Sequence, residues 1–295
     1  MAAVTNATTS TTVDHHVNPE LIERALVYAL QRPYVWQAIV HTPDLRNAQT
    51  AVDAHPIISQ LAAAAATTET DEVASAQLSR TNSTITTAEY AKATFLSDRA
   101  ARLSTQSEVS IAVDRLMDAC MLEIDTAVLT LASSMSNSIG NNATPHTVVN
   151  FNTAISTFRV QVGSTTMRPV FVHSASAIRD LHEDAVSNAA AIYGSLVGVQ
   201  LHDATSGVNQ GLRRQFGNID IIETAGVVAG DTTGKANFIV LVGGPPSALR
   251  VPIGKDPMIE PGRVAERIGT WLVASYERGV GIFDQARCLR VITRA

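Results

Sequence analysis

The chain has 295 residues, enough for about two domains or one large one. Hydrophobic residues make up 45% and charged residues 17%, which permits a sizeable core, whereas the net charge of −5 argues against a surface devoted to gripping a phosphate backbone. No apolar run approaches the roughly 20 residues that cross a bilayer, and residues 1–17 lack a secretory signal pattern, so we expect no membrane partner.

The first hundred residues carry little material for a core. Residues 1–17 are rich in Thr, Ala and Asn and predict a flexible arm, and Asn18 followed by Pro19 predicts a helix as far as Gln31. Residues 62–97 predict a β-hairpin that turns at 79–82, and neither of its faces is apolar enough to order it alone. Such a hairpin is expected to lie against another molecule; a disordered linker is the alternative.

Residues 105–140 predict one long helix around which the rest of the chain is organised. An apolar residue recurs every three or four positions: Val109, Val113, Leu116, Cys120, Ile124, Ala127, Leu131 and Met135. Thr105 and Glu108 match a capping box and Gly140 supplies a stop, for a length on the order of 50 Å. Asp114, Asp118 and Asp125 lie off this stripe, so we expect a solvated face there.

The remaining residues predict a mixed block of helices and strands. Thr144 and Pro145 are expected to open a helix with an apolar face, and Ser174 is expected to cap another. Expected strands cover 168–172, 196–201, 219–222, 238–242, 269–276 and 288–293, and the run 238–242 is apolar throughout, as in a central strand. The fold class is therefore α+β.

The sequence carries no recognisable catalytic, cofactor-binding or metal-binding constellation. The loop 243–247 lacks the lysine of a P-loop and contains two prolines, and no H-E-x-x-H, C-x-x-C or nucleophile elbow is present. Cys120 and Cys288, the only cysteines, sit in apolar segments that predict buried free thiols. His182 is followed by two acidic residues, but neighbours in sequence rarely form a catalytic pair. We therefore expect a protein that is not an enzyme and needs no cofactor or metal.

The order of these elements resembles a known family. Residues 84–103, followed directly by the capped helix, resemble the extended loop and spine helix of tailed-phage major capsid proteins, which have the Hong Kong ninety-seven-type coat fold. Residues 168–181 are similar to the strand and helix of that family's axial domain, and 271–292 to the returning strands of its peripheral domain.

The resemblance implies a division of the chain and a function. It implies an N-terminal arm (1–45), an extended loop (46–103), a peripheral domain with the spine helix (104–145), an axial domain (146–261) and returning peripheral strands (262–295). It also implies a subunit that forms pentamers and hexamers, closing into an icosahedral shell around double-stranded DNA. Such a virion protein assembles in the cytoplasm of the bacterial host. Scaffolding, portal and cement proteins are the partners to consider, although the family's longer N-terminal scaffolding extension is not apparent.

Five residues of the expected loop are candidates for contacts between subunits: Arg80, Glu89, Tyr90, Lys92 and Phe95. Some members of the family weld subunits through a Lys–Asn isopeptide bond, which requires a lysine kept away from water. Lys92 is the only lysine in the loop and shares a face with polar residues, so we expect a shell held by non-covalent contacts. Two alternatives remain: an encapsulin, which is a bacterial compartment shell of the same fold, and a soluble α/β enzyme with a disordered insertion.

Overall fold

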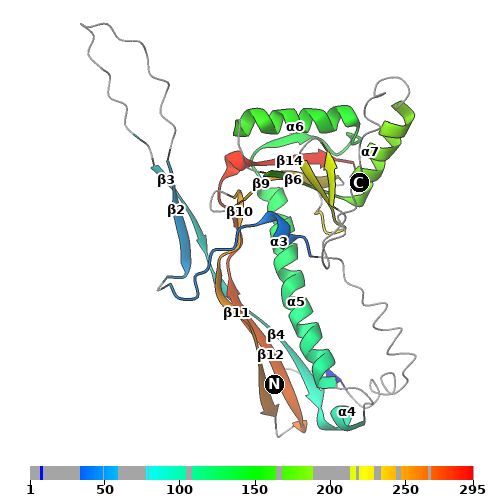
Figure 1. Cartoon of the computed structure of the whole chain (residues 1–295). Helices are drawn as coiled ribbons and strands as arrows, with labels where there is room; N and C mark the ends of the chain where they lie inside the picture. The colour runs from blue at the N-terminus through cyan, green and yellow to red at the C-terminus, as the bar shows by residue number, and fades with distance from the viewer. Residues whose placement is uncertain are drawn as a thin grey trace, which may run out of the picture.

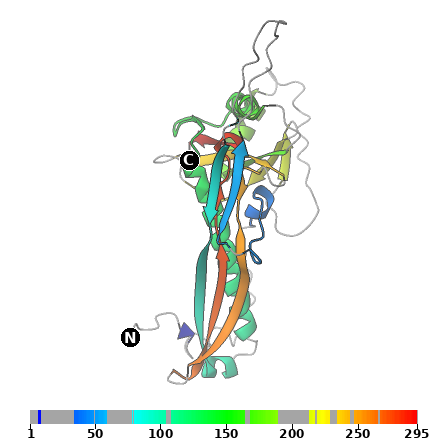
Figure 2. The ribbon, with the colours of Figure 1, turned by 90° about the vertical axis from the view of Figure 1, so that its left-hand side faces the viewer.

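A computed structural model describes residues 7–8, 34–48, 50–58, 78, 80–103, 108–163, 168–188, 213–216, 219–228, 234–243, 247–264 and 267–294. Its helices are α3 (Trp36–Ile39), α4 (Asp98–Leu103), α5 (Glu108–Thr130), α6 (Val148–Val162) and α7 (Ala175–Asn188). Its strands are β1 (Ala7–Thr8), β2 (Val52–Ile58), β3 (Arg80–Thr86), β4 (Ala88–Ser97), β5 (Ser138–Gly140), β6 (Arg168–His173), β7 (Arg213–Phe216), β8 (Ile219–Glu223), β9 (Lys235–Val242), β10 (Leu249–Arg250), β11 (Ile253–Val264), β12 (Gly269–Arg278), β13 (Gly281–Ile282) and β14 (Cys288–Thr293). They form a block at one end, a long limb and a projecting hairpin (Figures 1 and 2).

The block is built on a six-stranded sheet with the order β5-β14-β9-β6-β8-β7. Strand β9 lies inside this sheet and is buried on both faces. Ile239 and Leu241 pack toward α6, whereas Phe238 and Val240 pack toward α3 and the end of α5 (Figure 1). This confirms the central strand that the apolar run predicts, because only a strand covered on both sides is apolar at every position.

The limb consists of a long four-stranded sheet, ordered β1-β4-β12-β11, with α5 packed on one face (Figure 2). Alternate residues of β12, among them Leu272 and Ala274, join one core with Leu116, Cys120 and Ile124 of α5. The predicted apolar stripe is therefore confirmed over the middle of the helix. Its side chains recur about every 3.6 residues along α5, and they pack against every second side chain of β12.

The spine helix is shorter than predicted. Helix α5 has 23 residues, about 35 Å at the usual rise per residue, and continues only into a short 3₁₀ turn at Leu131–Ser134. The hydroxyls of Ser133 and Ser134 donate to the carbonyl oxygens of Thr130 and Leu131, in competition with helix continuation. Gly140, predicted as the helix stop, has φ 84° and lies in β5, where a Cβ would collide with the carbonyl oxygen of Ile292.

The assignment of helix faces was wrong at both ends of α5. Val109, placed on the apolar stripe, is 46% exposed. Asp125, placed on the solvated face, is completely buried, because α3 covers that side of the helix. Asp114 is exposed as predicted, and Asp118 is half-buried, its main-chain oxygen accepting a hydrogen bond from the hydroxyl of Tyr34.

The hairpin begins further upstream than predicted. Strand β2 pairs with β3 over seven residues, so Arg80, Thr81 and Asn82, predicted as a turn, lie within a strand. Strand β4, predicted as the returning arm of the hairpin, pairs along all ten residues with β12 in the long sheet. The projecting two-stranded ribbon therefore ends at Thr86, before β4 joins the long sheet. Strand β2 has no recognisable strand pattern in the sequence, because it contains Pro56 and polar residues before it. Pro56 is tolerated because both strands of a two-stranded ribbon are edge strands, where a missing N–H donor can face solvent.

Strands that were assigned to different predicted domains pair with one another, while the domain division itself remains a prediction. Strand β14, assigned to the returning peripheral strands, pairs with β5 and β9 in the six-stranded sheet, and β11, most of it assigned to the axial domain, pairs with β12 in the long sheet. The helix expected after Thr144 is capped by Thr147, whose hydroxyl oxygen accepts from the main-chain N–H of Asn150. Its expected apolar face is buried as predicted.

Other predictions are confirmed or lie beyond the described residues. Ser174 caps α7 as expected, its hydroxyl oxygen accepting from the N–H of Ala177. Both cysteines are buried free thiols. The flexible segment expected at 1–17 (apart from β1), the helix at 18–31, Thr105 of the capping box and the strand at 196–201 fall outside the described residues. Within these residues, no helix has the length and apolar character needed to cross a membrane.

Candidate assembly surface

The hairpin of β2 and β3 stands away from the rest of the subunit (Figure 1). It leaves the body at Ala51 and returns at Thr87, where the N–H of Thr87 donates to the carbonyl oxygen of Ala51 at 2.8 Å. In its two strands only Asp53 and Ile85, both near the base, are buried. Toward its far end, Ile58 and Leu78 are 60% and 58% exposed. A two-stranded ribbon with exposed apolar side chains is marginal in water, so this surface suits a contact with another molecule.

A buried ion pair attaches the hairpin to the body. The guanidinium of Arg250, on β10, is buried and donates to the Asp53 carboxylate at 3.2 Å. It also lies over the ring of Phe283, 3.7 Å from the ring centre. His55 places Nδ1 2.9 Å from the same carboxylate. The base is therefore held by charge-assisted hydrogen bonds in a site from which water is excluded.

An apolar contact completes this joint. The side chain of Ile85 packs against Gly281, where an added Cβ would lie 2.8 Å from Cγ1 of Ile85. That separation is below normal van der Waals contact, so the position requires glycine for the hairpin to approach. Together with the Arg250–Asp53 pair, this contact fixes the direction in which the hairpin leaves the body.

The five contact candidates fall in different places. Arg80 is exposed on the hairpin, whereas the other four lie on β4 in the long sheet. Glu89 and Lys92 are exposed there. Tyr90 stacks on Tyr276 of its own chain, and Phe95 is buried against Trp271. Phe95 therefore exposes little side-chain surface in the isolated subunit, and contacts between subunits by all five residues remain predictions.

A second polar joint, which the sequence did not indicate, links the spine helix to the long sheet. The carboxylate of Glu123 on α5 accepts from the hydroxyl of Tyr276 at 2.6 Å and from Nε of Arg278 at 3.0 Å. Burial, followed by the bond to Glu123, raises the pKa of Tyr276, so this phenol remains a donor. The guanidinium of Arg278 also lies over the ring of Tyr90. The residues in contact here are about 150 positions apart in the chain, so a pattern of neighbouring residues in the sequence cannot predict the contact.

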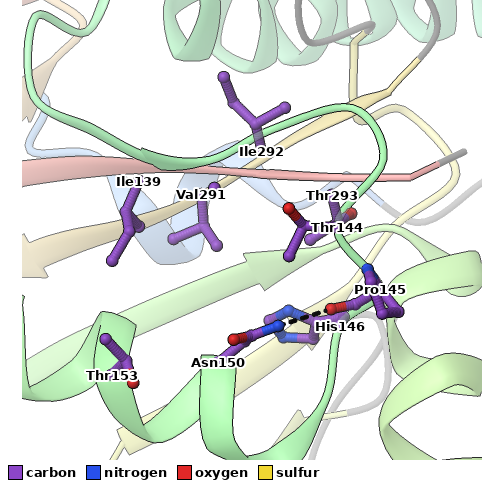
Figure 3. Close-up of a pocket in the computed structure, with 10 residues that line it drawn as sticks. Ile139, Thr144, Pro145, His146, Asn150, Thr153, Val291, Ile292 and Thr293 are labelled. Carbon is purple, nitrogen blue, oxygen red and sulfur yellow. Dashed lines mark hydrogen bonds between the residues drawn. The ribbon is translucent and has the colours of Figure 1, made fainter.

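A shallow pocket lies between the start of α6 and the end of β14 (Figure 3). Across it Asn150 donates from Nδ2 to the carbonyl oxygen of Pro145 at 2.9 Å. The lining residues are Ile139, Gly140, Thr144, Pro145, His146, Asn150, Thr153, Val291, Ile292 and Thr293. This set offers one imidazole and no carboxylate or thiol. Within the described ranges, no three His, Cys, Asp or Glu side chains are grouped as metal ligands.

Comparison with known proteins identifies the architecture. No protein-family model matches the sequence, and no curated protein matches it either. Solved structures do match. The head protein of Helicobacter pylori bacteriophage KHP40 superposes with a TM-score of 0.67 at 13% identity, over 90% of this chain and 93% of that one. The capsid of cyanophage Pam1 gives a TM-score of 0.65 at 12% identity, over 87% and 88% of the two chains.

The chain has the fold of a phage capsid protein. The acid-stable capsid of Helicobacter pylori bacteriophage KHP30 matches over 100% of both chains, with a TM-score of 0.62 and 12% identity. The long helix, the long sheet beside it and the projecting hairpin agree with the Hong Kong ninety-seven-type coat fold that the sequence resembles. At these identities the coat fold is shared, while the side-chain contacts described above are properties of this chain.

Proposed function

We propose that this protein is the major coat subunit of a tailed phage, and that it assembles as pentamers and hexamers into an icosahedral shell enclosing double-stranded DNA. The observation that supports this most directly is the hairpin, which is joined firmly to the body but has almost no core of its own. A firm joint combined with an uncovered ribbon suits an element that lies over a neighbouring subunit.

The proposal assigns the chain a structural role without catalysis. A net charge of −5 suits a shell that encloses DNA without binding it tightly, because a protein with a net negative charge is repelled by the phosphate backbone. Its partners are further copies of itself, with scaffolding, portal and cement proteins as additional candidates. The virion is its location, reached after assembly in the bacterial cytoplasm. Arg80, Glu89 and Lys92 are the exposed residues proposed for contacts between subunits.

Removing the hairpin should separate folding from assembly. A short glycine-serine linker that replaces residues 52–86 joins Ala51 to Thr87, whose main chains already meet at 2.8 Å. We expect a folded subunit that is less stable than the full chain, because Arg250 loses Asp53, but that keeps a cooperative thermal transition and forms no closed shells. The removed strands contribute only two buried residues to the body. Circular dichroism measures the folding, and negative-stain electron microscopy measures the assembly.

The matched point variant is Ile58→Ser with Leu78→Ser, and its control is Val160→Ser, 85% exposed on α6. The hairpin pair should weaken shells without changing subunit stability, and the control should assemble normally. Closed shells of unchanged diameter and stability from the deletion variant would contradict the proposed role of the hairpin. Particles that contain an enzyme in place of DNA would indicate an encapsulin-type shell.

We also expect the shell to be held by non-covalent contacts. Lys92 is exposed on β4, where water solvates its side chain and no apolar wall encloses it. Particles boiled in detergent should therefore give a single band near 31.3 kDa on a denaturing gel. A ladder of multimers that Lys92→Ala abolishes would show instead that the subunits are welded.

A further inference from the structure

Two histidines lie side by side in the core of the block. His146 precedes α6 and is 1% exposed, and His173 ends β6 and is 0% exposed. Their ring centres are 4.8 Å apart. None of their four ring nitrogens has a hydrogen-bond partner. Buried polar atoms are paired in most proteins, so this arrangement calls for an explanation.

The surroundings of the pair are mainly aromatic. The ring of Phe171 lies 3.7 Å from that of His173, and Phe151, on α6, stacks on both Phe171 and His173. From β9 the pair is approached by Asn237, which is neutral and donates to Thr293. Nothing in this shell of aromatic and amide groups compensates a positive charge on an imidazole.

The carboxylates on α7 near the histidine pair already accept hydrogen bonds from other groups. On α7, the carboxylate of Asp180 accepts two hydrogen bonds from Arg294, at 2.7 and 2.9 Å, and Asp184 accepts from the N–H of Val148. On β8, Glu223 is the register partner of His173, and its side chain is only half-buried. A proton added to either ring therefore enters a low-polarity site whose nearest carboxylate already pairs with an arginine.

The lowered pKa values of the two histidines determine how the stability of the folded subunit changes with pH. Burial lowers the pKa of His146 from 6.5 to about 4, and burial together with the neighbouring His146 lowers the pKa of His173 well below its usual value. The unfolded chain therefore takes up these protons before the folded chain does. Their contribution to stability is complete above pH 6.5, and it is lost progressively as the pH falls toward 4.

We propose that the His146–His173 pair is an acid-sensitive switch built into the block, and that its protonation releases the packing of α6 and α7 on the six-stranded sheet. Among the described residues, the buried histidines are His146 and His173, and neither lies on α5 or on a strand of the long sheet, so the switch acts on the block and not on the limb. In a shell, this switch loosens one part of every subunit and leaves the others in place.

The first test compares the pH dependence of unfolding in three proteins. Between pH 7.5 and 4.5 the unfolding constant of the unaltered subunit should rise at least on the order of 100-fold more than that of the His146→Phe, His173→Phe double variant, because the shifted pKa of His146 alone requires about that factor and His173 adds to it. Val160→Ser, at an exposed position on α6 with no titratable group, should retain the full dependence. An equal dependence in the unaltered subunit and the double variant would overturn the proposal.

The second test needs no variant. Hydrogen–deuterium exchange of the unaltered subunit at pH 7.5 and 4.5, corrected for the intrinsic pH dependence, should show the first loss of protection in α6 and α7. Exchange that increases first in α5 or β12 would place the acid-labile element elsewhere. Because both experiments read out the isolated subunit, their results do not depend on whether the protein assembles into shells.

Discussion

Replacing Arg250 by alanine should lower the free energy of unfolding by about 3–5 kcal/mol, the usual cost of breaking a buried ion pair. The substitution leaves the Asp53 carboxylate, 4% exposed, without its guanidinium partner. It also removes the contact over the ring of Phe283. Urea denaturation followed by circular dichroism measures the loss, and faster protease cleavage within the hairpin should accompany it.

Arg46→Ala is the matched control for this substitution. Arg46 also pairs with two carboxylates, those of Asp44 and Asp256, but all three side chains are about half-exposed. Exposed pairs contribute little, so the control should lower the unfolding free energy by only a small fraction of the loss from Arg250→Ala. In the double variant of Asp53→Ala and Arg250→Ala, the loss should be smaller than the sum of the two single losses. Equal effects of Arg46→Ala and Arg250→Ala would mean that the base of the hairpin is not closed to water.

The second large effect should come from Asp125. Its Oδ1 accepts from the N–H groups of Val35 and Trp36, at 2.9 and 3.1 Å, at the start of α3. Asp125→Ala leaves these buried donors without an acceptor, and the expected loss is about 2–4 kcal/mol in the free energy of unfolding. Thermal and urea denaturation of the isolated subunit measure it.

Two other substitutions separate the capping role from a general effect of charge. Asp125→Asn keeps an acceptor oxygen at the same place and should recover more than half of the loss. Asp114→Ala, at an exposed position on the same helix, should stay within about 0.5 kcal/mol. A loss from Asp114→Ala as large as that from Asp125→Ala would show that the helix presents a different face to the core.

Local patterns in the sequence were sufficient for most of the elements and for the fold. The apolar spacing that identifies α5 depends on residues three and four apart, which share a face whatever the rest of the chain does. The uninterrupted apolar run of β9 likewise requires a strand covered on both faces. Element order then carried the resemblance to the coat fold, and the solved capsid structures agree with it.

Asp125 and Gly140 show where local patterns stop being informative. Asp125 follows a core residue of α5, and its burial depends on α3, which begins about 90 residues earlier in the chain. Gly140 resembles a helix stop, but close packing of β5 on β14 is what requires a glycine at this position. In both cases the deciding neighbour is distant in sequence, so no window of adjacent residues contains the information.

The sequence by itself determined the helices α5, α6 and α7 and the strands β6, β8, β9, β12 and β14, that the fold is α+β, and that the extended loop has too few apolar residues to form a core. Only the tertiary structure decided the pairings: β4 with β12 about 180 residues later, β14 with the six-stranded sheet, and Arg250 with Asp53. It also decided that His146 and His173 are buried together. The physical reason is that periodicity arises from backbone geometry along the chain, whereas strand partners and buried charges depend on which distant surfaces pack together.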